Sequence, residues 1–199
     1  IDALGHTHRV RGDVTNYDDV RRAISEYQPD TVIHTAALAA VKIANKDPIT
    51  TYKSNILGTV NVLEACRAMG VKTVIAVNSD KVYGHVLDAT EKSPYLHSGP
   101  YETSKACDAM IIESYRHFYV LNVIMPVFSN LYGYDEMNDR IVPNIIRTCM
   151  KGENPKIYSA TKDMLRQYIY IDDAIDAILG LLADGPELNT SYPENLYKR

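Results

Sequence analysis

Several features that would assign a protein to a membrane or to a polymer partner are missing from this sequence of 199 residues. No uninterrupted apolar stretch is long enough to span a bilayer, and no charged-then-apolar leader opens the chain, so we expect a cytoplasmic protein without a membrane partner. The net charge of -4 provides no broad basic field. Nucleic acid is therefore not expected as a partner, and a phosphate ligand would have to be met by locally placed arginines or backbone amides.

Cysteine is scarce as well, which limits the metal and redox chemistry of the chain. The three cysteines, Cys66, Cys107 and Cys149, are widely separated, and each falls in a stretch with helical character. This spacing favours reduced, partly buried thiols over disulfides or a metal site. A hydrophobic content of 46% is nevertheless enough to bury one good core.

Short apolar runs of strand length alternate with longer segments of helical period, which is typical of an α/β fold. Three runs predict buried parallel strands: DTVIHTAA at residues 30–37, KTVIAVNS at 72–79 and LNVIMPV at 121–127. The helical period predicts helices over residues 18–27, 48–69, 101–119, 141–151 and 172–182. Pro48 suits the first turn of the second helix, and Gly70 suits its end.

Three reactive side chains, Ser79, Asp80 and Lys81, directly follow the second predicted strand. Ligands bind outside the carboxyl ends of the strands in a sheet of this kind. An ordinary polar loop would explain these three residues alone equally well. A second feature is therefore needed to decide whether Ser79, Asp80 and Lys81 belong to an active site.

That second feature is the segment PYETSK at residues 100–105, at the start of a predicted helix. Tyr101 and Lys105 are four residues apart, so their side chains leave the same face of the helix. An ammonium near a phenol favours the phenolate and lowers the pKa of the phenol, which gives a base that takes a proton from an alcohol during hydride transfer. Together with the strand-end triplet, this pair predicts an active site.

These motifs and several further segments resemble the extended short-chain dehydrogenase/reductases, the NAD-dependent nucleotide-sugar epimerases and 4,6-dehydratases. The Ser-Asp-Lys form of the triplet is most similar to the CDP-glucose 4,6-dehydratases. The resemblance is carried by GDV at residues 12–14, HTAA at 34–37, NILGTVNVLEACR at 55–67, SDKVYG at 79–84, PYETSKA at 100–106, SNLYG at 129–133, NDRIVP at 138–143 and RQYIYIDD at 166–173.

The resemblance implies a doubly wound, Rossmann-like parallel sheet. It places an incomplete NAD-binding domain at residues 1–133 and a partial substrate-binding lobe at 134–199, mixed with a segment at 167–183 that returns to the sheet. The family's first strand, glycine-rich turn and first helix have no counterpart in the sequence, and relatives continue through another substrate-lobe segment where this sequence stops, so the chain is expected to be truncated at both ends. Pro126 also stands where relatives usually have arginine, which removes a polar contact.

The resemblance also implies the chemistry: NAD as cofactor and a nucleoside-diphosphate hexose as substrate. Tyr101, assisted by Lys105, takes the proton of the C4 hydroxyl, and Ser79 holds that oxygen. We assign Asp80 as the acid for the departing C6 hydroxyl and Lys81 as the base at C5. Lys81 stands where many dehydratases carry glutamate, and a lysine can serve only if desolvation or a nearby cation lowers its pKa.

The remaining implied sites are binding contacts, each with a simpler structural alternative. His34 is as readily a core histidine as a functional one, and arginines commonly form surface salt bridges. The family commonly forms a homodimer through the two helices predicted at residues 48–69 and 101–119. The cofactor contacts implied are Asp13, Val14, Ala36, Ala37 and Asn55, and the substrate contacts are Asn130, Arg140 and Arg166, the two arginines as clamps for a diphosphate.

Three functions follow from these residues. A 4,6-dehydratase is favoured, because Asp80 and Lys81 supply an acid and a base beyond what oxidation alone requires. A 4-epimerase needs only Tyr101, Lys105, Ser79 and a pocket in which the keto sugar can rotate. A non-catalytic remnant would explain why the glycine-rich turn has no counterpart.

Overall fold

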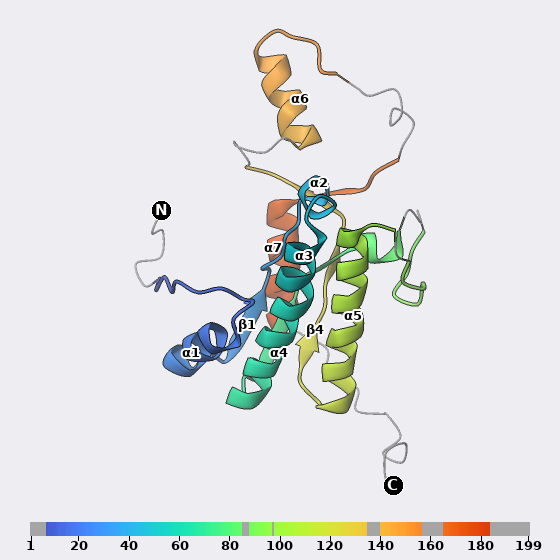
Figure 1. Ribbon diagram of the computed structural model, residues 1–199. Helices are drawn as coiled ribbons and strands as arrows, with labels where there is room; N and C mark the ends of the chain where they lie inside the picture. Colours follow the sequence, from blue (N-terminus) through green and yellow to red (C-terminus); the bar gives the residue numbers. More distant parts are fainter. Residues whose placement is uncertain (1–6, 85–87, 97, 135–139, 157–164, 184–199) are drawn as a thin grey trace.

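A parallel sheet lies at the centre of the computed structural model, which describes residues 7–84, 88–96, 98–134, 140–156 and 165–183 (Figure 1). Its three central strands have the order β1-β2-β4 and are all parallel: β1 (Thr31–His34), β2 (Thr73–Ala76) and β4 (Val123–Ile124). Two further parallel pairs continue it, β3 (Asn78–Ser79) with β5 (Val127–Phe128), and β6 (Asn130–Tyr132) with β7 (Tyr168–Tyr170). The predicted mixed α/β fold with parallel strands is thus confirmed.

The strands predicted at 72–79 and 121–127 are each interrupted once, and Pro126 is one reason. Proline has no N–H to donate, so it removes one rung between the paired strands. The register is unchanged across this gap, since Val74 is opposite Val123 and Asn78 is opposite Val127, an offset of 49 residues in both cases. The interruption therefore breaks the ladder without shifting the two strands along each other.

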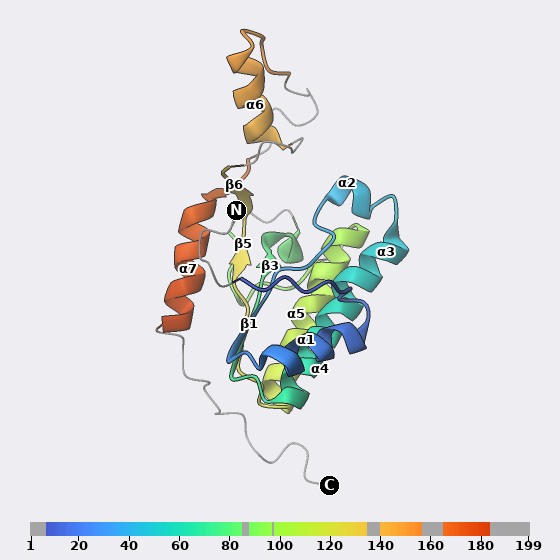
Figure 2. The ribbon, with the colours of Figure 1, turned by 90° about the vertical axis from the view of Figure 1, so that its left-hand side faces the viewer.

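Helices cover both faces of the sheet (Figure 2). One face is covered by α1 (Tyr17–Tyr27), α4 (Gly58–Met69) and α5 (Pro100–Phe118), and α7 (Ile171–Ala183) lies on the opposite face. α6 (Ile141–Met150) stands away from the sheet in both views. The returning segment predicted at residues 167–183 contains β7 and α7, whereas the division into domains at residue 133 stays a prediction.

The predicted helices begin and end within a residue of the observed ones, because their ends carry local signals. Asn16 caps α1 by accepting a hydrogen bond from the Asp18 N–H at 3.0 Å. Asp47 does the same for Thr50 at 3.0 Å, ahead of Pro48 in α3 (Pro48–Tyr52). Gly70 adopts the left-handed conformation, φ 73°, that ends α4.

The helix predicted over residues 48–69 contains a feature that its period does not predict. Between α3 and α4, residues Lys53–Leu57 form a π-helical turn (η1), which accommodates one extra residue in the helix. A short helix, α2 (Val41–Ala44), precedes α3. The π-helical turn carries Asn55, whose side chain is completely buried.

The hydrophobic core lies between the sheet and the helices α1, α4 and α5. Burial raises the pKa of the Cys66 thiol in this core to about 12, so this thiol is inert at neutral pH. Within the described residues, no helix is both long and apolar enough to cross a membrane. The buried core residues are Ile24, Val62, Leu63, Ala65, Cys66, Val71, Val74, Ala76, Ile112, Leu121 and Val123.

Replacing Leu63 by alanine tests this core, because the Leu63 side chain is completely buried on α4. The variant should lose about 2–5 kcal/mol of unfolding free energy, through lost burial and the cavity left behind. Urea unfolding followed by circular dichroism measures the loss. The control is Met150→Ala on α6, where the residue is 83% exposed and the loss should be small. Equal losses in both variants would contradict the packing described here.

Candidate active site

The triplet Ser79, Asp80 and Lys81 lies at the carboxyl end of β3, where a short 3-10 turn (η2, Asp80–Tyr83) begins. The Ser79 hydroxyl donates to Asp80 Oδ1 at 3.2 Å and accepts from the Lys81 N–H at 3.4 Å. Lys81 Nζ forms an ion pair with Asp80 Oδ1, also at 3.2 Å. The three reactive side chains therefore form one hydrogen-bonded group rather than a loose polar loop.

Tyr101 joins this group from the first turn of α5. Its side chain is buried, and its phenol lies close enough to Ser79 for the Ser79 side chain to lower its pKa. Burial raises the pKa of Tyr101, the Ser79 hydrogen bond and the charge of Arg140 lower it, and the charges of Asp80 and Asp108 raise it. The pKa of the phenol is raised in total, so the structure favours the neutral phenol.

Lys105 is buried on the same helix, but its ammonium points to other partners. Lys105 Nζ donates to Asp108 Oδ2 at 2.9 Å and to the backbone oxygen of Val77 at 3.3 Å. The predicted lowering of the Tyr101 pKa by Lys105 is wrong for this structure, because burial of the phenol dominates and Asp108 pairs with the ammonium. The catalytic assignment of the two residues itself stays a prediction.

Asn55 connects two parts of the site. Its Oδ1 accepts from the Leu38 N–H at 2.7 Å, and its Nδ2 donates to Ser104 Oγ at 2.8 Å. Ser104 Oγ in turn donates to the backbone oxygen of Tyr101 at 2.7 Å. The buried amide thus ties the loop after β1, which contains the exposed residues Ala36 and Ala37, to the first turn of α5.

The other residues predicted to contact the cofactor lie before α1. Asp13 Oδ1 accepts from the Thr15 N–H at 2.8 Å, and this contact lowers the pKa of Asp13. The backbone oxygen of Val14 accepts from Asn61 Nδ2 at 2.8 Å. Gly58 allows α4 to approach closely here, because a Cβ at this position would lie 2.9 Å from Val14 Cγ2. Contact of Asp13, Val14, Ala36, Ala37 and Asn55 with a cofactor stays a prediction.

The three residues predicted to contact the substrate are less closely grouped. Asn130 Nδ2 donates to the backbone oxygen of Gln167 at 2.8 Å and so helps to hold the segment before β7 against β6. Arg140 is exposed just before α6, and its charge acts on Tyr101. Arg166 is exposed just before β7. Arg140 is thus linked through its charge to Tyr101.

Three partners of the site residues were not predicted from the sequence. Thr59 and Ser104 give no signal, because a buried hydroxyl has no periodic pattern of its own. Asp108 does give one, since it follows Lys105 by three residues and therefore shares its helix face. Charge spacing on the helix could have identified this ion pair.

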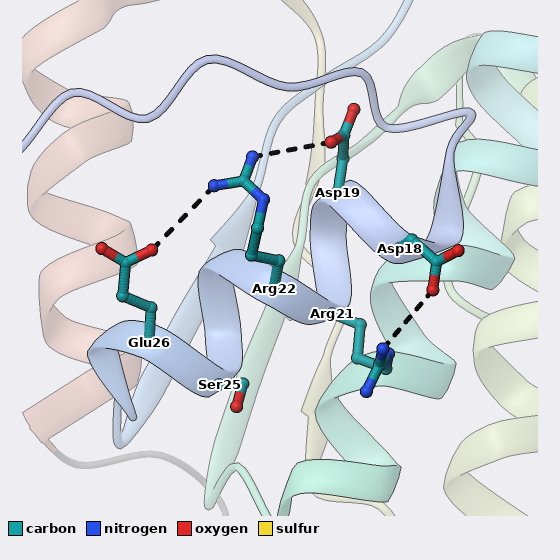
Figure 3. Close-up of a pocket in the computed structure, with 6 residues that line it drawn as sticks. All are labelled: Asp18, Asp19, Arg21, Arg22, Ser25 and Glu26. Carbon is teal, nitrogen blue, oxygen red and sulfur yellow. Dashed lines mark ion pairs between the residues drawn. The ribbon is translucent and has the colours of Figure 1, made fainter.

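A surface pocket of about 460 Å³ lies elsewhere, along α1 (Figure 3). Its ion pairs join Arg21 to Asp18 at 3.6 Å, Arg22 to Asp19 at 3.5 Å and Arg22 to Glu26 at 3.9 Å, all within one helix and at least partly exposed. Exposed pairs of this kind contribute little energy and reflect a solvated helix face. We therefore place the site at the strand ends and not in this pocket.

His34 illustrates the electrostatic effect of burial at the end of β1. Its Nε2 lies 3.1 Å from Thr59 Oγ1, and burial together with the charge of Lys105 lowers the pKa of His34 to about 4. A buried, hydrogen-bonded and neutral imidazole fits the core alternative better than a functional role.

This histidine predicts a pH dependence of stability. The pKa of His34 is lower in the folded state than the ordinary value of 6.5, so the unfolded state binds protons more readily between pH 6.5 and about 4. The unfolding free energy should fall as the pH falls through this window, by up to roughly 3 kcal/mol from His34. His34→Gln should flatten the dependence in urea unfolding at pH 7 and 4.5, whereas the exposed control His117→Gln should not. Parallel pH profiles for wild type and His34→Gln would refute this interpretation.

Comparison with known proteins identifies the family. The family model for the NAD dependent epimerase/dehydratase family matches residues 1–191. The dTDP-glucose 4,6-dehydratase of Xanthomonas campestris is 30% identical over 188 residues, covering 88% of this chain and 53% of the relative. That of Mycobacterium tuberculosis is 32% identical over 181 residues, covering 88% and 54%. The predicted similarity to CDP-glucose 4,6-dehydratases in particular is not supported by these relatives.

Solved structures agree with this result. The double mutant of DesIV, a dTDP-glucose 4,6-dehydratase from Streptomyces venezuelae with NAD and DAU bound, matches with a TM-score of 0.82 at 25% identity, covering 92% of this chain and 57% of that chain. UDP-glucose 4-epimerase from Thermus thermophilus in complex with NAD matches with a TM-score of 0.76 at 29% identity, covering 87% and 59%. The chain spans little more than half the length of these relatives. It belongs to the NAD-dependent epimerase/dehydratase family.

Proposed function

We propose that the protein is an NAD-dependent nucleotide-hexose 4,6-dehydratase. The observation that carries this proposal is the hydrogen-bonded group of Ser79, Asp80 and Lys81 beside the buried phenol of Tyr101. Oxidation of an alcohol requires one base, whereas elimination of water also requires a separate acid and base. The dTDP-glucose 4,6-dehydratases among the relatives support the same reaction class.

The site fits the nicotinamide half of NAD. Small, exposed side chains at Ala36 and Ala37 leave room for a ligand at the end of β1, and Asn55 ties this loop to the first turn of α5, which carries Tyr101. The described residues include no glycine-rich turn that would bind the pyrophosphate of NAD, so the fit concerns the nicotinamide half alone. Bound NAD would accept a hydride from C4 of the hexose and return it to C6.

In the oxidation step, Tyr101 removes the proton of the C4 hydroxyl while Ser79 holds that oxygen by a hydrogen bond. Burial disfavours the charged phenolate of Tyr101, so a nearby positive charge must stabilise it. Arg140 supplies such a charge, since it lowers the pKa of Tyr101. The diphosphate of the substrate is assigned to Arg140 and Arg166, and Asn130 completes the predicted contacts.

In the elimination step, Lys81 removes the C5 proton, and Asp80 protonates the C6 hydroxyl, which leaves as water while the C5–C6 double bond forms. This step needs a neutral amine and a neutral acid. The contact between Lys81 Nζ and Asp80 Oδ1 at 3.2 Å provides a route to both, because passing one proton from Lys81 to Asp80 converts the ion pair into the required pair. When the C5–C6 double bond is reduced, Lys81 returns its proton to C5.

The number of protons on the enzyme is unchanged after a turnover if Tyr101 returns one proton to Asp80. After one turnover Tyr101 has gained the C4 hydroxyl proton, and Asp80 has lost the proton that left with water. Ser79 is next to both groups, since its hydroxyl donates to Asp80 Oδ1 at 3.2 Å and its side chain lowers the pKa of the Tyr101 phenol. A transfer from Tyr101 through Ser79 to Asp80 therefore closes the cycle without a further acid.

Asp80→Asn tests the dehydratase. Calorimetric titration with NAD comes first, followed by assays with nucleoside-diphosphate glucoses in deuterated water. The variant should form the 4-keto-6-deoxy product at least about a hundredfold more slowly, since general acid catalysis contributes about 10²–10⁴. The control is Asp30→Asn, an exposed carboxylate directly before β1 and therefore at the opposite end of the strands from the triplet, which should retain activity.

Two results would overturn the proposal: no NAD binding by the chain, or full dehydratase activity in Asp80→Asn. If Lys81→Ala still exchanges the C5 proton with solvent, Lys81 is not the base.

A nucleotide-sugar 4-epimerase is the second candidate, favoured by the structural match to the Thermus thermophilus epimerase. It would need Tyr101, Lys105 and Ser79 but not Asp80, so Asp80→Asn should spare it. A chain that binds neither NAD nor nucleotide sugar would instead be a non-catalytic remnant.

We further propose that the protein forms a homodimer through the helices at residues 48–69 and 101–119. These helices carry exposed apolar side chains: Ile49, Tyr52, Leu57, Met69, Met110 and Phe118. Light scattering should give the mass of a dimer for wild type and of a monomer for Met110→Asp. Met150→Asp on α6, where the side chain is 83% exposed, should remain a dimer. A monomeric wild type would exclude this interface.

A further inference from the structure

The residue directly before the triplet, Asn78, is a buried amide that the proposed reaction does not use. Only 3% of this residue is exposed, at the point where β3 begins. Burying an amide is unfavourable unless its N–H groups and its oxygen are hydrogen-bonded. Leucine has the same branched shape and would fill a plain core position without this requirement. The partners of the amide therefore indicate what Asn78 does.

The amide nitrogen of Asn78 joins β3 to the helix that carries Tyr101 and to the neighbouring strand. Asn78 Nδ2 donates to the backbone oxygen of Lys105 in α5 at 3.1 Å and to Met125 Sδ at 3.4 Å. A helical carbonyl has a second lone pair for such a donor. Met125 lies between β4 and β5, next to the interruption at Pro126. One side chain thus holds three elements together where the strand ladder is broken.

The amide oxygen of Asn78 binds the backbone of the triplet. The Val77 N–H points toward β1 and donates to the backbone oxygen of His34 at 3.0 Å. Because strand residues alternate in direction, the Ser79 N–H points to the same side, but β1 ends at His34. Asn78 Oδ1 accepts from the Ser79 N–H at 2.8 Å instead. The Asn78 side chain therefore takes the place of a neighbouring strand for Ser79.

We propose that Asn78 is a positioning residue that fixes the Ser79 backbone and couples it to α5, so that Ser79 and Tyr101 meet the same substrate oxygen. This inference rests on the proposed function, in which Tyr101 takes the proton of the C4 hydroxyl and Ser79 holds its oxygen. Asn78 acts through these two residues rather than on the substrate. A displacement of reacting groups by about 1 Å can lower a rate about a hundredfold, so a loose Ser79 would slow the oxidation step.

Asn78→Leu tests the positioning in the protein without cofactor or substrate. Hydrogen exchange of single backbone amides is followed by NMR, and the rate at Ser79 is divided by the rate at Val74, whose N–H donates to Asn122 in the core at 2.8 Å. This ratio should rise at least about tenfold, because the Ser79 N–H loses its acceptor while the core ladder stays intact. A residue that only stabilised the whole fold would raise both rates together and leave the ratio unchanged.

The kinetic measurement follows with NAD and the nucleoside-diphosphate glucose that wild type converts. Asn78→Leu should lower kcat about tenfold to a hundredfold. The KM for the nucleotide sugar should stay within about a factor of three, because Asn78 is assigned no contact with it. Reduction of NAD in a single turnover, followed by absorbance, should slow by the same factor as kcat, since Ser79 and Tyr101 act in the oxidation step.

The matched control is Asn122→Leu, which removes the same kind of amide from the opposite end of the same strands. Asn122 Nδ2 donates to Thr73 Oγ1 at 3.2 Å, where β2 begins. This variant should keep the wild-type kcat and the slow exchange at Ser79. If Asn78→Leu does not fold, Asn78→Ser replaces it, because serine is too short to reach the Lys105 oxygen.

An unchanged exchange ratio in a folded Asn78 variant overturns the proposal, and so does an unchanged kcat. An equal loss of kcat in Asn122→Leu also overturns it, because the effect would then not depend on the end of the strands that carries Ser79. A wild type that forms no 4-keto-6-deoxy product contradicts the proposed function instead. The exchange ratio needs no turnover, so the two failures are distinguishable.

Discussion

The geometry of the candidate site depends on one buried amide. Asn55 has no exposed surface, and its two ends reach different elements, the Leu38 N–H after β1 and Ser104 Oγ in α5. A buried amide without partners is unfavourable by several kcal/mol, so both contacts are strongly preferred over alternatives. The π-helical turn at Lys53–Leu57 carries Asn55 to the place where one side chain spans both partners. The position of Tyr101 then follows from its backbone contact with Ser104.

Electrostatics in the site are set by burial first and by individual charges second. Burial shifts Tyr101 and His34 toward their neutral forms, since a phenolate and an imidazolium both lose hydration there. Arg140, Asp80 and Asp108 then adjust the phenol in opposite directions. A charged ligand bound near Tyr101 would shift the pKa of the phenol again, because the phenol responds to each nearby charge.

Local signals explain why much of the fold was predictable from the sequence. Capping residues such as Asn16 and Asp47, and Gly70 at a helix end, act over a few residues and can be read directly. The triplet at residues 79–81 was predicted because it directly follows a strand. The π-helical turn was not predictable, since the contact of Asn55 is with Ser104, 49 residues away. The pair of Lys105 with Asp108 could be read from their spacing on the helix, whereas the contact of Lys105 with the backbone oxygen of Val77 could not. The effect of Pro126 was foreseen only as a lost side-chain contact, whereas it also breaks the strand ladder.

The unchanged register across that break has a consequence for how the site is built. Because both segments keep the same offset of 49 residues, the position of Ser79 opposite Phe128 is inherited from the pairing of Val74 with Val123 in the core. The missing rung at Pro126 removes one hydrogen bond between the strands without changing their alignment. The pairing of the apolar residues in the core therefore determines which residue of the neighbouring strand lies opposite the reactive end of the sheet.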